Sequence, residues 1–186
     1  MIRWGVVFLL TNRFLPNCKG GSNMRCELKK IGFFHYGEEL ADPTESLRAC
    51  FEEASKNTAL SDCVIVLPEA LNVQGGYWGV DRTIDHSIAH VLGQLASDFG
   101  VALLAGLIDE GRDGSRGYSS AYLFDGADRR LLTHKMADDG SKNYTPFGDD
   151  CDAPIRHRGV CLASLICMDA ADFNSPLTDR HSTLLA

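Results

Sequence analysis

The sequence lacks any apolar run long enough to cross a membrane. The longest apolar stretch near the N-terminus, Trp4 to Leu10, is followed at once by Asn12, Arg13 and Pro16, whereas a membrane-spanning helix needs about 20 apolar residues. A secretory signal peptide would need a longer apolar core and a small-residue cleavage site. We therefore expect a protein without a membrane partner.

Paired cysteine spacing is also missing. The chain has 7 cysteines, an odd number, and no two of them form a CxxC motif. A secreted disulfide framework and a structural zinc site therefore have no support, and we expect a reducing, cytoplasmic setting. His86 and His90 are four residues apart but lack the glutamate of an HExxH zinc motif, and no GxGxxG follows a strand. The sequence thus predicts no metal and no cofactor.

An excess of basic residues is absent as well. Lys and Arg total 18 against 25 for Asp and Glu, which gives a formal net charge of -7. Nucleic-acid binding requires clustered cations to neutralise phosphates. The charge balance therefore argues against nucleic acid as a partner.

The remaining composition is that of one globular domain. The 186 residues are 45% hydrophobic and 23% charged, which is close to the globular average, and a chain of this length typically forms a single domain. We interpret residues 1–29 as an N-terminal extension that need not be ordered, and residues 30–186 as the domain.

Short apolar runs alternate with helical patterns along that domain. One helix is predicted to begin at Asp42-Pro43, with an apolar face at i, i+3, i+4 and i+7. A second is predicted to begin near Asp81 or Thr83 and to end at Gly100. The predicted strands are Ile31–His35, Cys63–Leu67, Val101–Ile108, Tyr118–Phe124, Leu131–Lys135 and Val160–Cys167. This alternation, followed by a hairpin around Asp125-Gly126, predicts an α/β fold with a mixed sheet.

Three chemically useful side chains follow or end apolar strands: Glu69, Lys135 and Cys167. Ligands of α/β sheets gather at the carboxyl ends of strands. A thiol nucleophile needs a proton acceptor, which Glu69 could supply, and Lys135 could stabilise an oxyanion. Read individually, such a cysteine is more often a small core hydrophobe, and such a glutamate or lysine is more often a solvated loop residue. Spacing alone does not select this trio.

Three longer segments of the sequence resemble a known protein family. Val64–Asn72 (VIVLPEALN), Tyr122–Met136 (YLFDGADRRLLTHKM) and Gly159–Phe173 (GVCLASLICMDAADF) resemble the signature regions of the nitrilase, or carbon–nitrogen hydrolase, superfamily. In that family these regions carry a glutamate, a lysine and a cysteine in the same order. The resemblance implies an α-β-β-α sandwich, a small-molecule amide substrate, no metal, and assembly into homo-oligomers.

The resemblance also implies roles for individual residues. Cys167 would attack the carbon of a C–N bond, Glu69 would move the protons, and Lys135 would stabilise the tetrahedral intermediate with the backbone N–H of Met168. A thioester acyl-enzyme would then be hydrolysed. The Met168-Asp169 pair after the cysteine is more similar to amide-hydrolysing branches than to nitrile hydrolases.

The sequence departs from the family pattern at two places. Many members have a second glutamate shortly after the lysine, but Ala137–Tyr144 contains none. Family members also continue well beyond the cysteine, whereas 19 residues follow Cys167 here, which leads us to expect that the C-terminal part of the sandwich is missing. Two alternatives therefore remain open: an inactive, truncated domain that acts as an interaction or assembly module, and acyl transfer to an amine.

Overall fold

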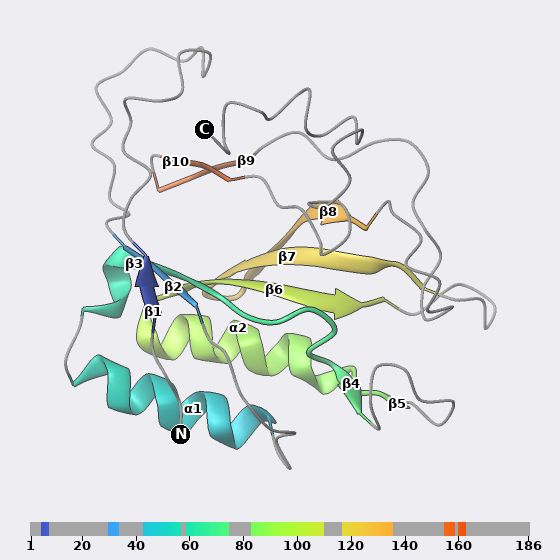
Figure 1. Ribbon diagram of the computed structural model, residues 1–186, viewed down its shortest axis with the longest axis horizontal. Coiled ribbons are helices and arrows are strands. Elements are labelled where there is room, and N and C mark those ends of the chain that lie inside the picture. Colours follow the sequence, from blue (N-terminus) through green and yellow to red (C-terminus); the bar gives the residue numbers. More distant parts are fainter. Residues whose placement is uncertain are drawn as a thin grey trace.

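A mixed six-stranded sheet forms the centre of the computed structural model (Figure 1). The model describes residues 5–7, 30–33, 43–56, 59–74, 83–109, 117–135, 155–158 and 160–162. The strand order is β1-β2-β3-β6-β7-β8; β2, β3 and β6 are parallel, and the other neighbours are antiparallel. These strands are β1 (Gly5–Val7), β2 (Lys30–Phe33), β3 (Cys63–Val66), β6 (Ala102–Ile108), β7 (Ser119–Asp125) and β8 (Asp128–His134). The predicted α/β class with a mixed sheet is confirmed.

Strand β1 lies inside the stretch that we interpret as an N-terminal extension. It pairs with β2 in antiparallel register, with Val6 opposite Gly32. The domain boundary near residue 30 stays a prediction.

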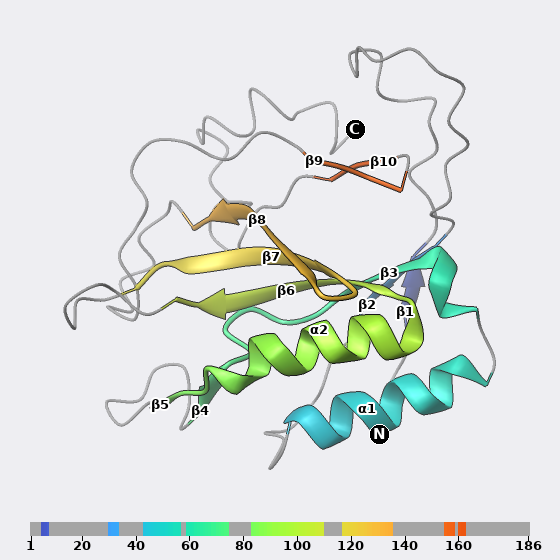
Figure 2. The same cartoon turned by 180° about the vertical axis from the view of Figure 1, so that it is seen from behind.

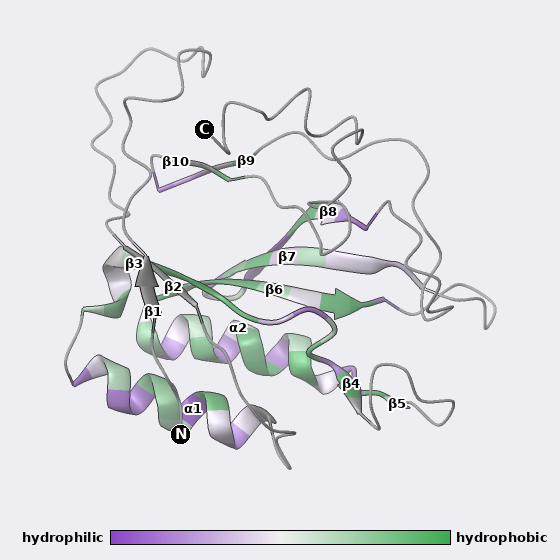
Figure 3. Ribbon diagram, in the orientation of Figure 1, coloured by the Kyte–Doolittle hydropathy of each residue, from purple (hydrophilic) through white to green (hydrophobic). Residues whose placement is uncertain are grey.

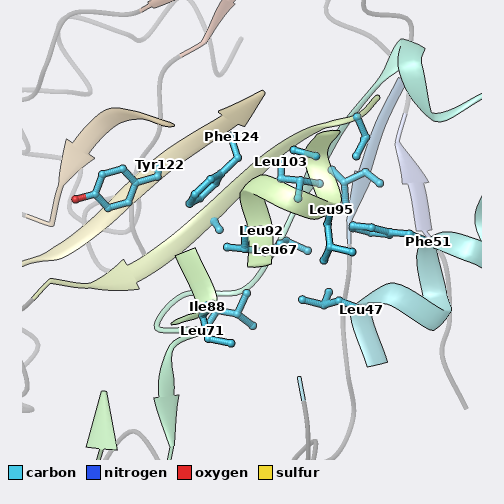
Figure 4. Close-up of a cluster of buried hydrophobic side chains, with 14 of the residues drawn as sticks. Leu47, Phe51, Leu67, Leu71, Ile88, Leu92, Leu95, Leu103, Tyr122 and Phe124 are labelled. Carbon is cyan, nitrogen blue, oxygen red and sulfur yellow. The ribbon is translucent and has the colours of Figure 1, made fainter. Parts of the chain in front are cut away.

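Two helices, α1 (Pro43–Ser55) and α2 (Ser87–Phe99), cover one face of the sheet (Figures 1 and 2). Apolar and polar residues alternate along both helices, as the green and purple bands in Figure 3 show. The apolar side packs on the sheet because residues three and four apart share a helix face. The core between the helices and the sheet, drawn in Figure 4, includes Leu47, Phe51, Leu67, Leu71, Ile88, Leu92, Leu95, Leu103, Tyr122 and Phe124.

The first turn of α2 is later than the sequence predicts. The helix begins at Ser87, because Thr83–Ile84 forms a short strand, β5, that pairs with β4 (Val73–Gln74). The Asp85 carboxylate then accepts hydrogen bonds from the backbone N–H and the hydroxyl of Ser87, at 2.9 and 2.6 Å. This side chain satisfies an amide that has no partner within the helix, and so sets the start. The helix ends as predicted at Gly100, whose φ of 61° is left-handed.

The hairpin of β7 and β8 is tighter than predicted. Strand β8 begins at Asp128 and not at Leu131, because Asp125 pairs directly with Asp128. The two-residue turn between them starts with Gly126 at φ 59°, a conformation that glycine adopts without steric cost. The predicted Asp125-Gly126 hairpin is therefore confirmed with a corrected boundary.

A second, smaller hairpin lies on the sheet face away from the helices (Figures 1 and 2). It consists of β9 (Ile155–His157) and β10 (Val160–Leu162) in antiparallel pairing. Ile155 and Leu162 pack against a cluster that comprises Val64, Ala102, Ala121, Leu123 and Leu132. The sheet therefore has apolar packing on both faces. The predicted strand Val160–Cys167 is described only as far as Leu162.

Within the part of the chain that the structure describes, neither helix combines the length and apolar character needed to span a bilayer.

Candidate active site

Glu69 lies in the turn that follows β3, next to the middle of β6. The backbone of this turn is hydrogen-bonded to β6 on both sides of Glu69: Gly106 N–H donates to the Pro68 carbonyl at 3.3 Å, and Leu71 N–H donates to the Gly106 carbonyl at 3.0 Å. Ala70 has a φ of 54°, which lets the chain turn sharply after the glutamate. The sheet thus fixes the backbone that carries the carboxylate.

Gly106 makes this close approach sterically possible. A Cβ atom at position 106 would lie 2.7 Å from the Cα of Glu69, well inside van der Waals contact. Glycine at this strand position is explained by the approach of another backbone, since glycine inside a strand is otherwise unfavourable. The position of Glu69 therefore depends on having glycine, which has no side chain, at position 106 of β6.

Asn72 completes the attachment of the turn. Its side-chain amide donates to the Ile108 carbonyl at 2.9 Å, and its side-chain oxygen accepts from the Ile108 N–H at 2.8 Å. The residue is 5% exposed, so both polar groups of this amide are satisfied inside the protein. Asn72 thereby extends the β6 hydrogen-bonding pattern to the turn, a role that sequence reasoning did not anticipate.

Lys135 directly follows β8, and its side chain is fully buried at 0% exposure. Its ammonium Nζ lies 3.0 Å from Oε1 of Glu69, which is 66 residues earlier in the chain. A buried ammonium is very costly unless it is paired and hydrogen-bonded. The carboxylate and ammonium that the sequence predicts to meet do so in the structure.

Ser119 is a third member of this arrangement. Its Oγ donates a hydrogen bond to the same Oε1 of Glu69 at 3.0 Å, and its carbonyl accepts from the Lys135 N–H at 2.7 Å. The residue is fully buried. Sequence reasoning did not single out Ser119. The only signal for it in the sequence was its position at the start of β7, the strand before the one that leads to Lys135.

An irregularity in the β7–β8 ladder decides which side chain stands beside Ser119. Tyr122 pairs with Leu131, but Ala121 pairs with Thr133, so β8 contains one extra residue at this point. The bulge shifts the alternation of β8, because side chains along a strand point to opposite faces in turn. As a result Lys135, and not His134, lies next to Ser119.

Cys167 and Met168, the predicted nucleophile and oxyanion donor, lie outside the described residues. The same holds for Ala137–Tyr144, the stretch without a second glutamate. The structure therefore brings together Glu69 and Lys135 and leaves the position of the thiol a prediction.

A separate polar cluster lies around Ser120, on the opposite side of β7 from Ser119. The Ser120 hydroxyl donates to Asp109 and is 2.7 Å from Nδ1 of His134. The Tyr122 hydroxyl donates to the Asp109 carboxylate at 2.8 Å. Burial, and then the hydrogen bond to Asp109, raises the pKa of Tyr122 to about 12. These polar groups satisfy one another within the helix-covered face.

Across the described segments, no group of three or more His, Cys, Asp or Glu side chains is arranged to hold a metal ion. The site offers a carboxylate that pairs with a buried ammonium and accepts a hydroxyl on the same carboxylate oxygen. Such a pair can accept a proton and can stabilise developing negative charge.

Comparison with known proteins finds similarity in structure. No protein-family model matches the chain, and no curated protein matches it in sequence. Among solved structures, the chain is similar to the glutamine-dependent NAD+ synthetase from Acinetobacter baumannii in complex with ADP, with a TM-score of 0.53 and 17% sequence identity. The match covers 77% of this chain and 27% of the synthetase. At this identity the similarity supports the α/β fold alone.

Proposed function

We propose that the protein hydrolyses a non-peptide carbon–nitrogen bond of a small amide through a cysteine-bound acyl intermediate. The observation that carries the proposal is the 3.0 Å contact between Lys135 Nζ and Glu69 Oε1 across 66 residues of sequence. Two residues that resemble a family's catalytic pair, which follow β3 and β8, are thus in contact although two strands of the sheet lie between β3 and β8. A merely solvated loop glutamate and loop lysine would not meet in this way.

Two further observations support the proposal. The helices cover one sheet face and the β9–β10 hairpin covers the other, an order of layers that supports the proposed α-β-β-α sandwich. The similar synthetase is glutamine-dependent, and a glutamine side chain ends in a primary amide, which is the bond class proposed here.

In the proposed reaction, Cys167 Sγ forms a bond to the amide carbon while Glu69 accepts the thiol proton. Lys135 and the Met168 N–H stabilise the negative charge on the former carbonyl oxygen. Glu69 then passes the proton to the departing amine as the C–N bond breaks, which leaves a thioester. Glu69 next takes a proton from water, whose oxygen displaces the sulfur and releases the acid, and Glu69 returns that proton to Cys167 Sγ. An amine in place of water would give acyl transfer by the same residues.

The proposal is tested with a Cys167→Ala variant and a panel of small aliphatic and aromatic amides, with ammonia or amine release as the readout. Removal of the nucleophile should lower turnover by at least about 1,000-fold. Cys161→Ala is the matched control, since it removes another cysteine of the same segment, and it should keep wild-type turnover. Equal turnover in wild type and Cys167→Ala would refute the proposal.

A further inference from the structure

Two hydrogen-bond donors converge on one oxygen of Glu69. Lys135 Nζ and Ser119 Oγ each lie 3.0 Å from Oε1. The torsion that rotates a glutamate carboxylate is intrinsically broad. One donor alone would allow the carboxylate to rotate about that donor, whereas two donors from different strands restrict the rotation. The Glu69 carboxylate is therefore held in one orientation by β7 and by the residue after β8.

This orientation makes the two carboxylate oxygens unequal. Oε1 receives the ammonium and the hydroxyl, so its lone pairs are committed to holding the side chain. We infer that Ser119 is a positioning residue that holds the Glu69 carboxylate in the orientation in which it accepts the Cys167 proton. This inference rests on the proposed function.

Ser119 is suited to this role by its attachment as well as by its hydroxyl. Its carbonyl accepts the Lys135 N–H at 2.7 Å, so the two donors to Oε1 are coupled through one backbone hydrogen bond. Both residues are fully buried, so water does not compete with Glu69 for either donor. The backbone positions that carry the hydroxyl and the ammonium are thus held next to each other.

Ser120 provides a matched comparison within the same strand. It is also fully buried, but it faces the other side of β7 and contacts Asp109 and His134. Loss of either hydroxyl removes a hydrogen bond made by a buried residue and should destabilise the fold. Loss of the Ser119 hydroxyl alone should affect the orientation of Glu69.

The test measures the rate at which iodoacetamide alkylates each cysteine, followed residue by residue by peptide mass spectrometry. The proposed function predicts that Cys167 of the wild type reacts faster than the other six cysteines. Ser119→Ala should slow Cys167 about tenfold without slowing the other six. Ser120→Ala should leave the Cys167 rate within twofold of the wild type.

A second pair of variants covers the case in which Ser119→Ala does not fold. Ser119→Thr and Ser119→Val have nearly the same shape and differ in the hydroxyl, so both share any packing cost. Ser119→Thr should keep fast Cys167 labelling, and Ser119→Val should lose it. Equal rates for the threonine and valine variants, or equal slowing by Ser119→Ala and Ser120→Ala, would overturn the inference while the proposed function stands. Uniform labelling of all cysteines in the wild type would overturn the proposed function and this inference with it.

Discussion

At the scale of single residues, the feature with the largest cost in free energy is the burial of the Lys135 ammonium. Its side chain is fully buried and its carboxylate partner is 25% exposed. Transfer of such a charge from water is offset only by close pairing and hydrogen bonding. Glu69 is therefore required by the fold as well as by the proposed chemistry.

Replacement of Glu69 by Ala should lower the free energy of unfolding by about 3–5 kcal/mol, because it leaves the Lys135 charge buried without its partner. Urea denaturation followed by circular dichroism measures the change. Combination with Lys135→Met should recover most of the loss. Glu53→Ala is a control for an exposed pair, since Glu53 and Lys56 are both more than half exposed, and it should change stability little. A Glu69→Ala loss as small as that of the control would contradict this account.

At the scale of elements, the β3 turn and strand β6 are in unusually close contact. A Cβ atom built at Gly106 would lie 2.7 Å from the Cα of Glu69, which is a steric overlap. By contrast, a Cβ at Gly93 of α2 would meet only the Gly126 carbonyl at 3.6 Å. A close backbone contact therefore requires glycine at position 106, whereas no such contact requires it at position 93.

Gly106→Ala should destabilise the protein by about 1–3 kcal/mol, because backbone must move to admit the methyl group. Gly93→Ala should be neutral or stabilising by about 0.5–1 kcal/mol, since alanine favours a helix interior. Thermal unfolding of the two variants under identical conditions measures both effects. Equal melting temperatures for the two variants would show that the turn is not held against β6.

Much of this element structure follows from periodicity in the sequence. The inward faces of α1 and α2 and the apolar runs of β3, β6 and β7 are readable because many residues repeat one pattern. The predicted start of α2, near Asp81 or Thr83, was wrong because Ile84 is four residues before Ile88 and so fits the helical spacing. A two-residue strand such as β5 has no period of its own, and only its pairing with β4 reveals it.

The site was predictable to a smaller extent. Glu69 and Lys135 stand out through the segments that resemble a known family, and their positions after strands are confirmed. Ser119, Gly106 and Asn72 were not found, because their roles consist of contacts between strands that no local pattern records.

At the scale of the whole molecule, Arg158 connects four separate segments. It has a φ of 43° in the turn between β9 and β10, and its guanidinium donates to Asp125 at 2.6 Å, to the Ser61 carbonyl at 2.7 Å and to the Gly100 carbonyl at 3.4 Å. These hydrogen bonds link the β9–β10 hairpin to the turn of the β7–β8 hairpin, to the segment before β3 and to the end of α2. Its buried neighbour His157 accepts from Arg130 at 3.0 Å.

His157 should make this attachment sensitive to acid. Burial, together with nearby Arg158 and Arg130 and against the opposing effect of Asp125, lowers its pKa below the ordinary 6.5. A lowered pKa in the fold means that stability is present above 6.5 and is lost as the pH falls below that value. The loss can reach about 1.4 kcal/mol per pH unit for one proton.

Urea denaturation at pH 7.5 and at pH 5.5 measures this dependence. The wild type should lose more stability between the two pH values than His157→Gln, which keeps an acceptor for Arg130 but does not titrate. Identical losses in the two proteins would exclude His157 as the cause.

The extra residue in β8 has a consequence for how this chain can change over time. Deletion of the extra residue, Leu132, would leave Lys135 beside Ser119, because every other pair of the hairpin keeps its partner. A further insertion between the Gly126 turn and the lysine would instead bring His134 to that place and put an imidazole beside Glu69. Single-residue changes of length in this segment therefore preserve the site only where a bulge absorbs them.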